Sequence, residues 1–223
     1  MTFKGGKGMS IKIIIADDHQ ITREGIRTML EKETDMKVLG EAEDGRSAVR
    51  MSRELEPDLI LMDVCMPDMN GIVATSLIRS EFPKIKVIAL SMLDDRRFVV
   101  NMLRAGASGY MIKDCSFKEL TRAIRRVMEN RTYLSPGVMD IVVQDYVKPT
   151  ASAASQYSSN LTLREKEVLQ LIAEGHSTAQ IAKRLSVSMK TIETHRQNLM
   201  MKINTKGIAG LTKYAIREGL TSV

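Results

Sequence analysis

The chain has 223 residues, which is long for one small domain and fits two. Its formal net charge of +6 is unevenly placed, because residues 161–223 hold ten Lys or Arg against five Asp or Glu and so carry +5 of the total. A basic small domain beside a nearly neutral larger one favours a polyanion as the partner of the small domain. A basic surface that serves only solubility gives the same balance, so charge alone leaves both interpretations open.

The composition also argues against disulfide-rich, cysteine-metal, membrane-spanning and secreted proteins. The only cysteines, Cys65 and Cys115, form no disulfide or metal-binding pattern. No apolar stretch approaches the ~18–20 residues that cross a bilayer, and Lys4 and Lys7 are not followed by the apolar core of a signal peptide. We therefore expect a cytoplasmic protein with no membrane partner, in which residues 1–10 form a disordered extension.

Short apolar runs alternate with amphipathic segments five times between residues 11 and 130. The predicted strands are Ile11–Ala16, Lys37–Ala42, Asp58–Met62, Val87–Ser91 and Gly109–Ile112. The predicted helices are Ile21–Lys32, Arg46–Leu55, Ile72–Ser80, Arg96–Arg104 and Phe117–Glu129, the last with a capping box at Ser116. Strands that alternate with helices predict an α/β fold with a doubly wound parallel sheet of five strands.

Two further segments follow the fifth helix. Residues 134–147 predict another helix, whose face carries Val138, Ile141, Val142 and Tyr146. Residues 149–160 are small, polar and of low complexity, and we interpret them as a linker.

The remaining signals are all helical. Capping boxes that begin at Thr162 and Ser177 each precede an apolar-periodic stretch. Ser188 is a suitable N-cap for a third helix, and residues 206–218 predict a fourth. The short second helix, the tight turn and the longer third helix form a helix-turn-helix pattern. The sequence therefore predicts a second, small all-α domain.

Chemistry-bearing residues stand at the ends of the predicted strands. Asp17 and Asp18 follow the first strand, Asp63 follows the third, Ser91 is the last residue of the fourth, and Lys113 follows the fifth. Because the carboxyl ends of parallel strands share one edge, these side chains can converge there. Clustered carboxylates need a cation, and Mg²⁺ prefers oxygen ligands. Asp63 is the candidate nucleophile that takes a phosphoryl group, with Lys113 and Ser91 bound to the phosphoryl oxygens.

Each residue also has an ordinary interpretation. Adjacent acids after a strand are usually a solvated turn, and Ser91 or Lys113 alone would be a turn or surface residue. The Cys65 side chain is best read as a small buried hydrophobe, and His19 as part of a helix entry.

An aspartyl-phosphate phosphatase of the haloacid dehalogenase kind would need a second carboxylate two residues after the nucleophile, where Cys65 stands. A flavodoxin-like cofactor module would need a phosphate-binding loop where the two acids stand, and a pure interaction module requires that the basic domain bind no nucleic acid.

Residues 11–130 closely resemble the receiver domain of bacterial two-component response regulators. The resemblance rests on a joint pattern: Asp17-Asp18, Asp63 with Pro67 and Gly71, Ser91, and Tyr110 with Lys113. It implies a flavodoxin-like fold and phosphorylation of Asp63 by a sensor histidine kinase, with slow autodephosphorylation rather than an enzymatic turnover. It further implies that Asp18, Asp63 and the Cys65 backbone carbonyl bind Mg²⁺, that Asp17 acts mostly through water, and that Ser91 and Tyr110 form the conformational switch.

Residues 161–220 resemble the LuxR-type helix-turn-helix, and the pair of domains resembles the NarL/FixJ class of response regulators. The carrying segments are residues 161–169, 174–182 and 187–196. We accordingly expect a receiver over residues 11–131, a linker helix and linker over 132–160, and a DNA-binding domain over 161–223. The resemblance places a homodimer contact on the fourth helix at Ile208, Leu211 and Ala215; packing within the domain is the alternative.

The third helix has two distinct faces at ~100° per residue. Ile192, Leu199 and Ile203 point inward, whereas the opposite face would enter the major groove of double-stranded DNA. The residues expected to contact DNA are Lys190, Thr191, Glu193, Thr194, Arg196, Gln197 and Lys202. A merely solvated polar face is the alternative.

Together these patterns predict a transcription regulator controlled by phosphorylation. We expect the unmodified receiver to hold back the recognition helix and phosphorylation to release it for dimerisation on DNA, with Tyr110 turning from exposed to buried. RNA polymerase is kept as a candidate partner.

Overall fold

The computed structural model describes residues 10–92, 95–147 and 161–221, which form two domains. The predicted N-terminal extension and the linker predicted at residues 149–160 lie outside the described residues, apart from Ser10. Strands of the N-terminal domain are β1 (Ile11–Ala16), β2 (Met36–Ala42), β3 (Leu59–Asp63), β4 (Lys86–Ser91), β5 (Gly109–Ile112) and β6 (Tyr133–Leu134). Its helices are α1 (Gln20–Leu30), α2 (Gly45–Leu55), α3 (Gly71–Glu81), α4 (Arg96–Arg104), α5 (Phe117–Met128) and α6 (Pro136–Val147).

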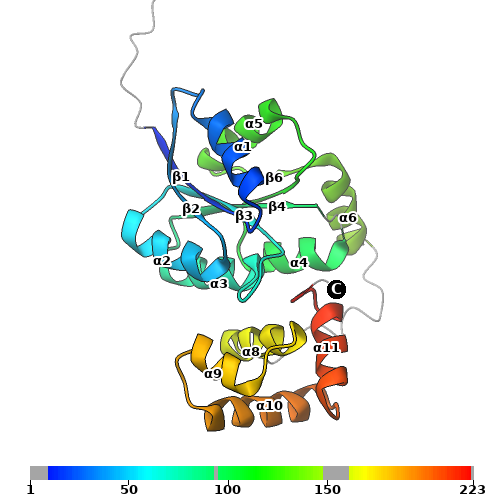
Figure 1. Cartoon of the computed structure of the whole chain (residues 1–223). Helices are drawn as coiled ribbons and strands as arrows, with labels where there is room; N and C mark the ends of the chain where they lie inside the picture. Colours follow the sequence, from blue (N-terminus) through cyan, green and yellow to red (C-terminus); the bar gives the residue numbers. More distant parts are fainter. Residues whose placement is uncertain (1–9, 93–94, 148–160, 222–223) are drawn as a thin grey trace, which may run out of the picture.

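The sheet has the order β2-β1-β3-β4-β5-β6 and is parallel throughout. Successive side chains point to opposite faces of a strand, so β1 serves two cores: Ile13 and Ile15 belong to one, and Ile14 and Ala16 to the other. Helices α1 and α5 cover the first face, and α2, α3 and α4 cover the second (Figure 1). The predicted doubly wound α/β fold is confirmed.

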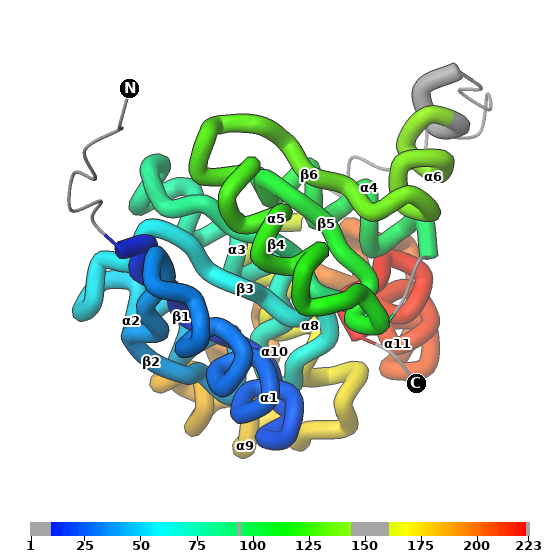
Figure 2. Tube along the Cα trace, turned by 90° about the horizontal axis from the view of Figure 1, so that it is seen from above, coloured from blue at the N-terminus to red at the C-terminus, as the bar shows by residue number. Residues whose placement is uncertain are grey.

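The predicted count of five strands is wrong by one. Tyr133 and Leu134 form β6, which pairs in parallel with Gly109 and Tyr110 of β5 (Figure 2). A two-residue strand is too short to produce an alternating pattern, so its existence depends on the neighbouring β5 edge rather than on its own sequence. Helix α6 then packs against α4, with Val138 fully buried.

The C-terminal domain contains α8 (Leu163–Ala173), α9 (Thr178–Arg184), α10 (Met189–Ile203) and α11 (Ile208–Arg217). Both predicted capping boxes are present, because Thr162 and Ser177 each accept a hydrogen bond from the third helical residue, whose side chain accepts one in return. Ser188 caps α10 as predicted. Ile192 and Leu199 of α10 lie in the core of the domain, so the predicted inward face is confirmed.

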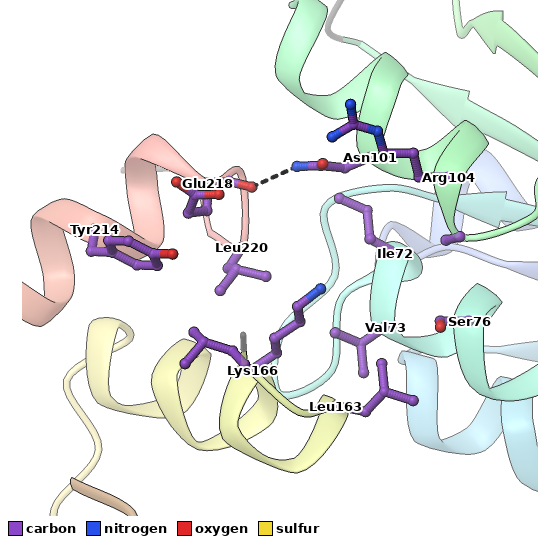
Figure 3. Close-up of a pocket in the computed structure, with 12 residues that line it drawn as sticks. Ile72, Val73, Ser76, Asn101, Arg104, Leu163, Lys166, Tyr214, Glu218 and Leu220 are labelled. Carbon is purple, nitrogen blue, oxygen red and sulfur yellow. Dashed lines mark hydrogen bonds between the residues drawn. The ribbon is translucent and has the colours of Figure 1, made fainter. Parts of the chain in front are cut away.

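The N-terminal domain contacts α8, Arg184 at the end of α9 and the end of α11, while α10 lies on the side away from it (Figure 1). Leu163 of α8 packs against the apolar core under α2, α3 and α4. Arg46 Nη2 lies 3.1 Å from Glu167 Oε1, and Asn101 Nδ2 donates to the Glu218 carbonyl at 2.9 Å (Figure 3). The interface therefore combines an apolar contact with polar pairs.

Across the part of the chain that the structure describes, none of the helices combines the length and apolar character that a membrane crossing needs.

Candidate functional site: an acidic edge and an exposed helix face

The carboxyl ends of four adjacent strands meet at one edge of the sheet. Asp63 is the last residue of β3, and Ser91 is the last residue of β4. Asp17 directly follows β1, and Lys113 directly follows β5. The convergence predicted from the parallel topology is thus present.

Lys113 joins the two buried acids. Its Nζ lies 2.7 Å from Asp17 Oδ2 and 2.8 Å from Asp63 Oδ2. Burial raises the pKa of Asp63 to about 6, and the Lys113 hydrogen bond and charge only partly oppose this. Burial alone lowers the pKa of Lys113, but its hydrogen bonds to Asp17 and Asp63 outweigh burial and raise it. The Asp63 carboxylate is therefore a desolvated anion beside a fixed cation.

A cation fits the same edge. Asp17, Asp18, His19 and Asp63 each offer a ligand atom, and these atoms all lie within 4.8 Å of one another. His19 Nδ1 lies 2.8 Å from Asp18 Oδ1, although the sequence assigned this histidine only to the helix entry. The three carboxylates supply the hard oxygen ligands that Mg²⁺ prefers. The residues present therefore fit a magnesium ion, with the imidazole at its margin.

Cys65 stands two residues after Asp63. Its backbone N–H donates to Asp63 Oδ1 at 3.4 Å. Burial, followed by the charge of Asp63, raises the pKa of the Cys65 thiol to about 11. A thiol that stays protonated near neutral pH is a poor metal ligand and a poor general base, so the side chain behaves as the predicted small hydrophobe.

Ser91 and Tyr110 lie on the neighbouring strands β4 and β5. Ser91 is 1% exposed and Tyr110 is 0% exposed, and their hydroxyl groups are hydrogen-bonded. Burial raises the pKa of the Tyr110 hydroxyl. The structure thus has Tyr110 in the buried one of the two positions expected for the switch.

The loop that begins directly after Asp63 ends where the chain packs back against the Asp63 backbone. The β3–α3 loop, residues 64–70, ends at Gly71, whose N–H donates to the Val64 carbonyl at 3.0 Å. A Cβ on Gly71 would lie 2.0 Å from the Asp63 carbonyl oxygen, so only glycine permits this approach. The loop is therefore closed tightly on Asp63.

The outward face of α10 is accessible. Lys190, Glu193, Thr194 and Gln197 are exposed, and Thr191 is partly buried. The four exposed residues share one accessible stripe, as the helical periodicity predicted, and Thr191 lies beside it. The N-terminal domain contacts α8, α9 and α11 rather than α10, so the expected restraint by the receiver does not act by covering this helix.

Two predicted DNA contacts are engaged within the domain. Lys202 Nζ lies 2.8 Å from both Glu165 carboxylate oxygens. Arg196 Nη1 donates to Thr178 Oγ1 at 3.0 Å. Lys202 therefore lies beside a neutralising acid, a partner that the helical pattern of α10 alone does not reveal.

The dimer contact predicted on α11 needs correction. Leu211 and Ala215 are fully buried in the core of their own domain, so they present no surface to a second copy. The alternative of packing within the domain applies to both. Ile208 is 52% exposed and remains available.

Comparisons with known proteins agree with this geometry. The family described as "Response regulator receiver domain" matches residues 13–125. The family described as "Bacterial regulatory proteins, luxR family" matches residues 159–215. The oxygen regulatory protein NreC of Staphylococcus carnosus is 37% identical over 214 residues, covering 94% of this chain and 99% of that protein.

The chain belongs to the NarL/FixJ class of two-component response regulators. It is a transcription regulator with a receiver domain and a LuxR-type DNA-binding domain, and this family is one of regulators rather than enzymes.

Solved structures support the same assignment. RcsB from Salmonella enterica serovar Typhimurium, bound to promoter rprA in the presence of the phosphomimetic BeF3-, is 28% identical. That match has a TM-score of 0.59 and covers 96% of this response regulator and all of that chain. The response regulator ChrA of a heme-sensing two-component system is 29% identical, with a TM-score of 0.52 and coverage of 95% and 98% of the two chains.

Proposed function

We propose that Asp63 is the phosphoacceptor of this response regulator and that a sensor histidine kinase is its donor. One Asp63 oxygen attacks the phosphorus of a phosphohistidine, the P–N bond breaks, and the imidazole leaves with the electron pair. The product is an acyl phosphate on Asp63. The observation that carries this proposal is the position of a buried carboxylate 2.8 Å from Lys113 Nζ, at an edge that also holds Ser91.

Each residue around Asp63 has a role that follows from its position. Lys113 neutralises one phosphoryl oxygen, and the Ser91 hydroxyl donates to another. Asp18, Asp63 and the Cys65 carbonyl would hold Mg²⁺, with Asp17 acting through water. When bound, the ion neutralises charge that develops on the phosphoryl group. Slow hydrolysis of the acyl phosphate would reset the protein.

The phosphoacceptor assignment is tested by labelling. Asp63→Asn should abolish phosphoryl incorporation from acetyl phosphate with Mg²⁺, measured by gel retardation of phosphorylated protein and by mass spectrometry. Asp114→Asn is the matched control, because Asp114 is an exposed acid at the same edge and should label normally. Undiminished labelling of the Asp63 variant would refute the assignment.

We further propose that α10 enters the major groove. Lys190 would contact phosphate, Glu193 would accept from cytosine N4, and Gln197 would pair with adenine. Thr191, Thr194 and Arg196 would contact the backbone nearby. The basic charge of the domain and the exposed stripe support this, and solved complexes of RcsB contain DNA-bound dimers. Lys202 can contact DNA only if its ion pair with Glu165 breaks.

We propose the domain limits 11–131, 132–160 and 161–223, a cytoplasmic location, and a homodimer on DNA with Ile208 at its contact. RNA polymerase remains a candidate partner of the DNA-bound form. A mobility shift on DNA at varied salt tests the nucleic-acid function, because phosphate contacts impose a steep salt dependence. Binding that does not weaken with salt would contradict it.

A further inference from the structure

Gln170 is a buried amide in the middle of α8, with 1% of its surface exposed. Its Nε2 donates to the Met66 carbonyl at 3.0 Å, and its Oε1 accepts from the Asn70 N–H at 2.9 Å. Both partners belong to the β3–α3 loop. One side chain of the DNA-binding domain thus satisfies a backbone donor and a backbone acceptor of the loop that follows Asp63.

Asn70 extends this connection to α11. Its side chain is 2% exposed, and its Nδ2 donates to the Leu220 carbonyl at 2.7 Å. Its Oδ1 accepts from the Val73 N–H at 2.9 Å and so caps α3. Asn70 therefore lies between the first turn of α3 and the chain that leaves α11.

Asp68 makes the loop's third attachment. It is ion-paired with Arg184 of α9, and its N–H donates to Glu174 Oε2 at 3.3 Å. Its φ of 65° is left-handed, a conformation that costs a non-glycine residue free energy and persists where surrounding contacts hold it. The loop is thus in a contact-dependent conformation.

The other end of the loop is fixed to the phosphoacceptor. The Cys65 N–H donates to the Asp63 carboxylate, and Gly71 packs on the Asp63 carbonyl. A group bound to the Asp63 carboxylate would therefore press on backbone that is one residue away from Met66.

The location of α10 excludes the simplest form of control. Its outward residues are exposed while the domains are docked, so docking does not block the groove-reading face. The β3–α3 loop touches both the Asp63 site and α8, so a signal that starts at Asp63 can act on the docked contacts themselves.

We propose that Gln170 is a positioning residue that couples the Asp63 site to the DNA-binding domain. It holds Met66 and Asn70 in the docked conformation, and phosphorylation of Asp63, on which this inference rests, shifts the loop and breaks both hydrogen bonds between Gln170 and the loop. Coupling between sites is reciprocal, so docking through Gln170 also disfavours the loop conformation that phosphorylation and Mg²⁺ require.

Gln170→Met in the full chain tests this, because methionine keeps the length of the side chain and removes the amide. Besides the bond from Nε2 to Glu174 Oε1 at the end of α8, this removes the two hydrogen bonds to the β3–α3 loop. Loss of the two loop bonds should raise the rate of labelling by acetyl phosphate about tenfold and lower the Mg²⁺ midpoint by a similar factor. Hydrogen exchange of the peptide over residues 64–72 should be fast in this variant from the start. In the unsubstituted chain it should become fast only after phosphorylation.

Asn101→Leu is the matched control. It removes a hydrogen bond from the same interface, to the Glu218 carbonyl, without touching the β3–α3 loop. We expect exchange at the end of α11 to increase while labelling stays within about twofold of the unsubstituted chain. A merely structural interface would instead make the two variants behave alike.

The outcomes separate the inference from the function on which it rests. Labelling and Mg²⁺ midpoints of Gln170→Met equal to those of the unsubstituted chain would overturn the coupling, as would loop exchange that phosphorylation leaves unchanged. If Asp63 takes no phosphoryl group in any variant, the proposed function fails, whereas a shifted midpoint with Mg²⁺ alone would still support the coupling.

Discussion

Neutralising Asp63 should stabilise the protein in the absence of metal. Asp63 is 4% exposed, and burial raises its pKa from 3.8 to about 6 although Lys113 opposes the shift. The folded state therefore holds this proton more tightly than the unfolded state. The ionised Asp63 carboxylate therefore lowers the free energy of unfolding. This loss is absent below pH 3.8, grows as the pH rises, and is complete above about pH 6. With 1.36 kcal/mol for each pH unit, the ionised carboxylate costs about 3 kcal/mol at pH 7.5.

Asp63→Asn removes that cost. In urea denaturation with EDTA, followed by circular dichroism, its free energy of unfolding should exceed that of the unsubstituted chain by about 3 kcal/mol at pH 7.5 and by about half as much at pH 5. Added Mg²⁺ should narrow the difference, because the ion offsets the charge. Asp114→Asn, an exposed acid, should change stability by less than about 0.5 kcal/mol. A gain that is absent at pH 7.5, or that increases on acidification, would refute the reasoning.

The metal site and the recognition helix give two further predictions. Asp18→Ala should weaken Mg²⁺ binding more than Asp17→Ala, since Asp17 is already occupied by Lys113; a titration with the reverse order would mean that their roles are exchanged. In binding-site selection, Glu193→Ala and Gln197→Ala should each relax preference at particular base pairs by about 1–3 kcal/mol. Lys190→Ala should weaken all sequences alike and flatten the salt dependence, and an unaltered preferred site in both polar variants would contradict the groove-facing assignment.

The strand ends could be read from the sequence because their signals are local. An apolar run such as Leu59–Met62 states both where a strand lies and where it ends, and the parallel topology then brings the carboxylates together. The inward face of α10 was equally local, since Ile192 and Leu199 follow helical periodicity. Capping boxes fixed the starts of α8 and α9 for the same reason.

The features that could not be predicted from the sequence depend on contacts between residues far apart along the chain. Gln170 reads as an ordinary polar residue of a surface helix, whereas its loop partners Asn70 and Met66 belong to the other domain. Leu211 and Ala215 form an apolar stripe whether it faces a second copy or the core of the domain, so periodicity could not separate the two. Lys202 looked free because Glu165 lies on another helix. The contact between domains likewise has no periodic signal.

The pairing of β6 with β5 has a consequence for the freedom of the second domain. Because β6 and α6 are attached to the receiver, only thirteen residues, 148–160, separate α6 from Leu161. Thirteen residues in any conformation span at most about 45 Å, and one domain within a sphere of that radius has an effective concentration of roughly 4 mM.

An interface with a dissociation constant of about 1 mM between separate domains would then be closed about four-fifths of the time. A tenfold weakening, about 1.4 kcal/mol or one to two hydrogen bonds, would leave it closed less than a third of the time. Because the two domains belong to one chain, even a weak contact can switch between a mostly docked and a mostly undocked state. The equilibrium between these states does not depend on the concentration of the protein in the cell.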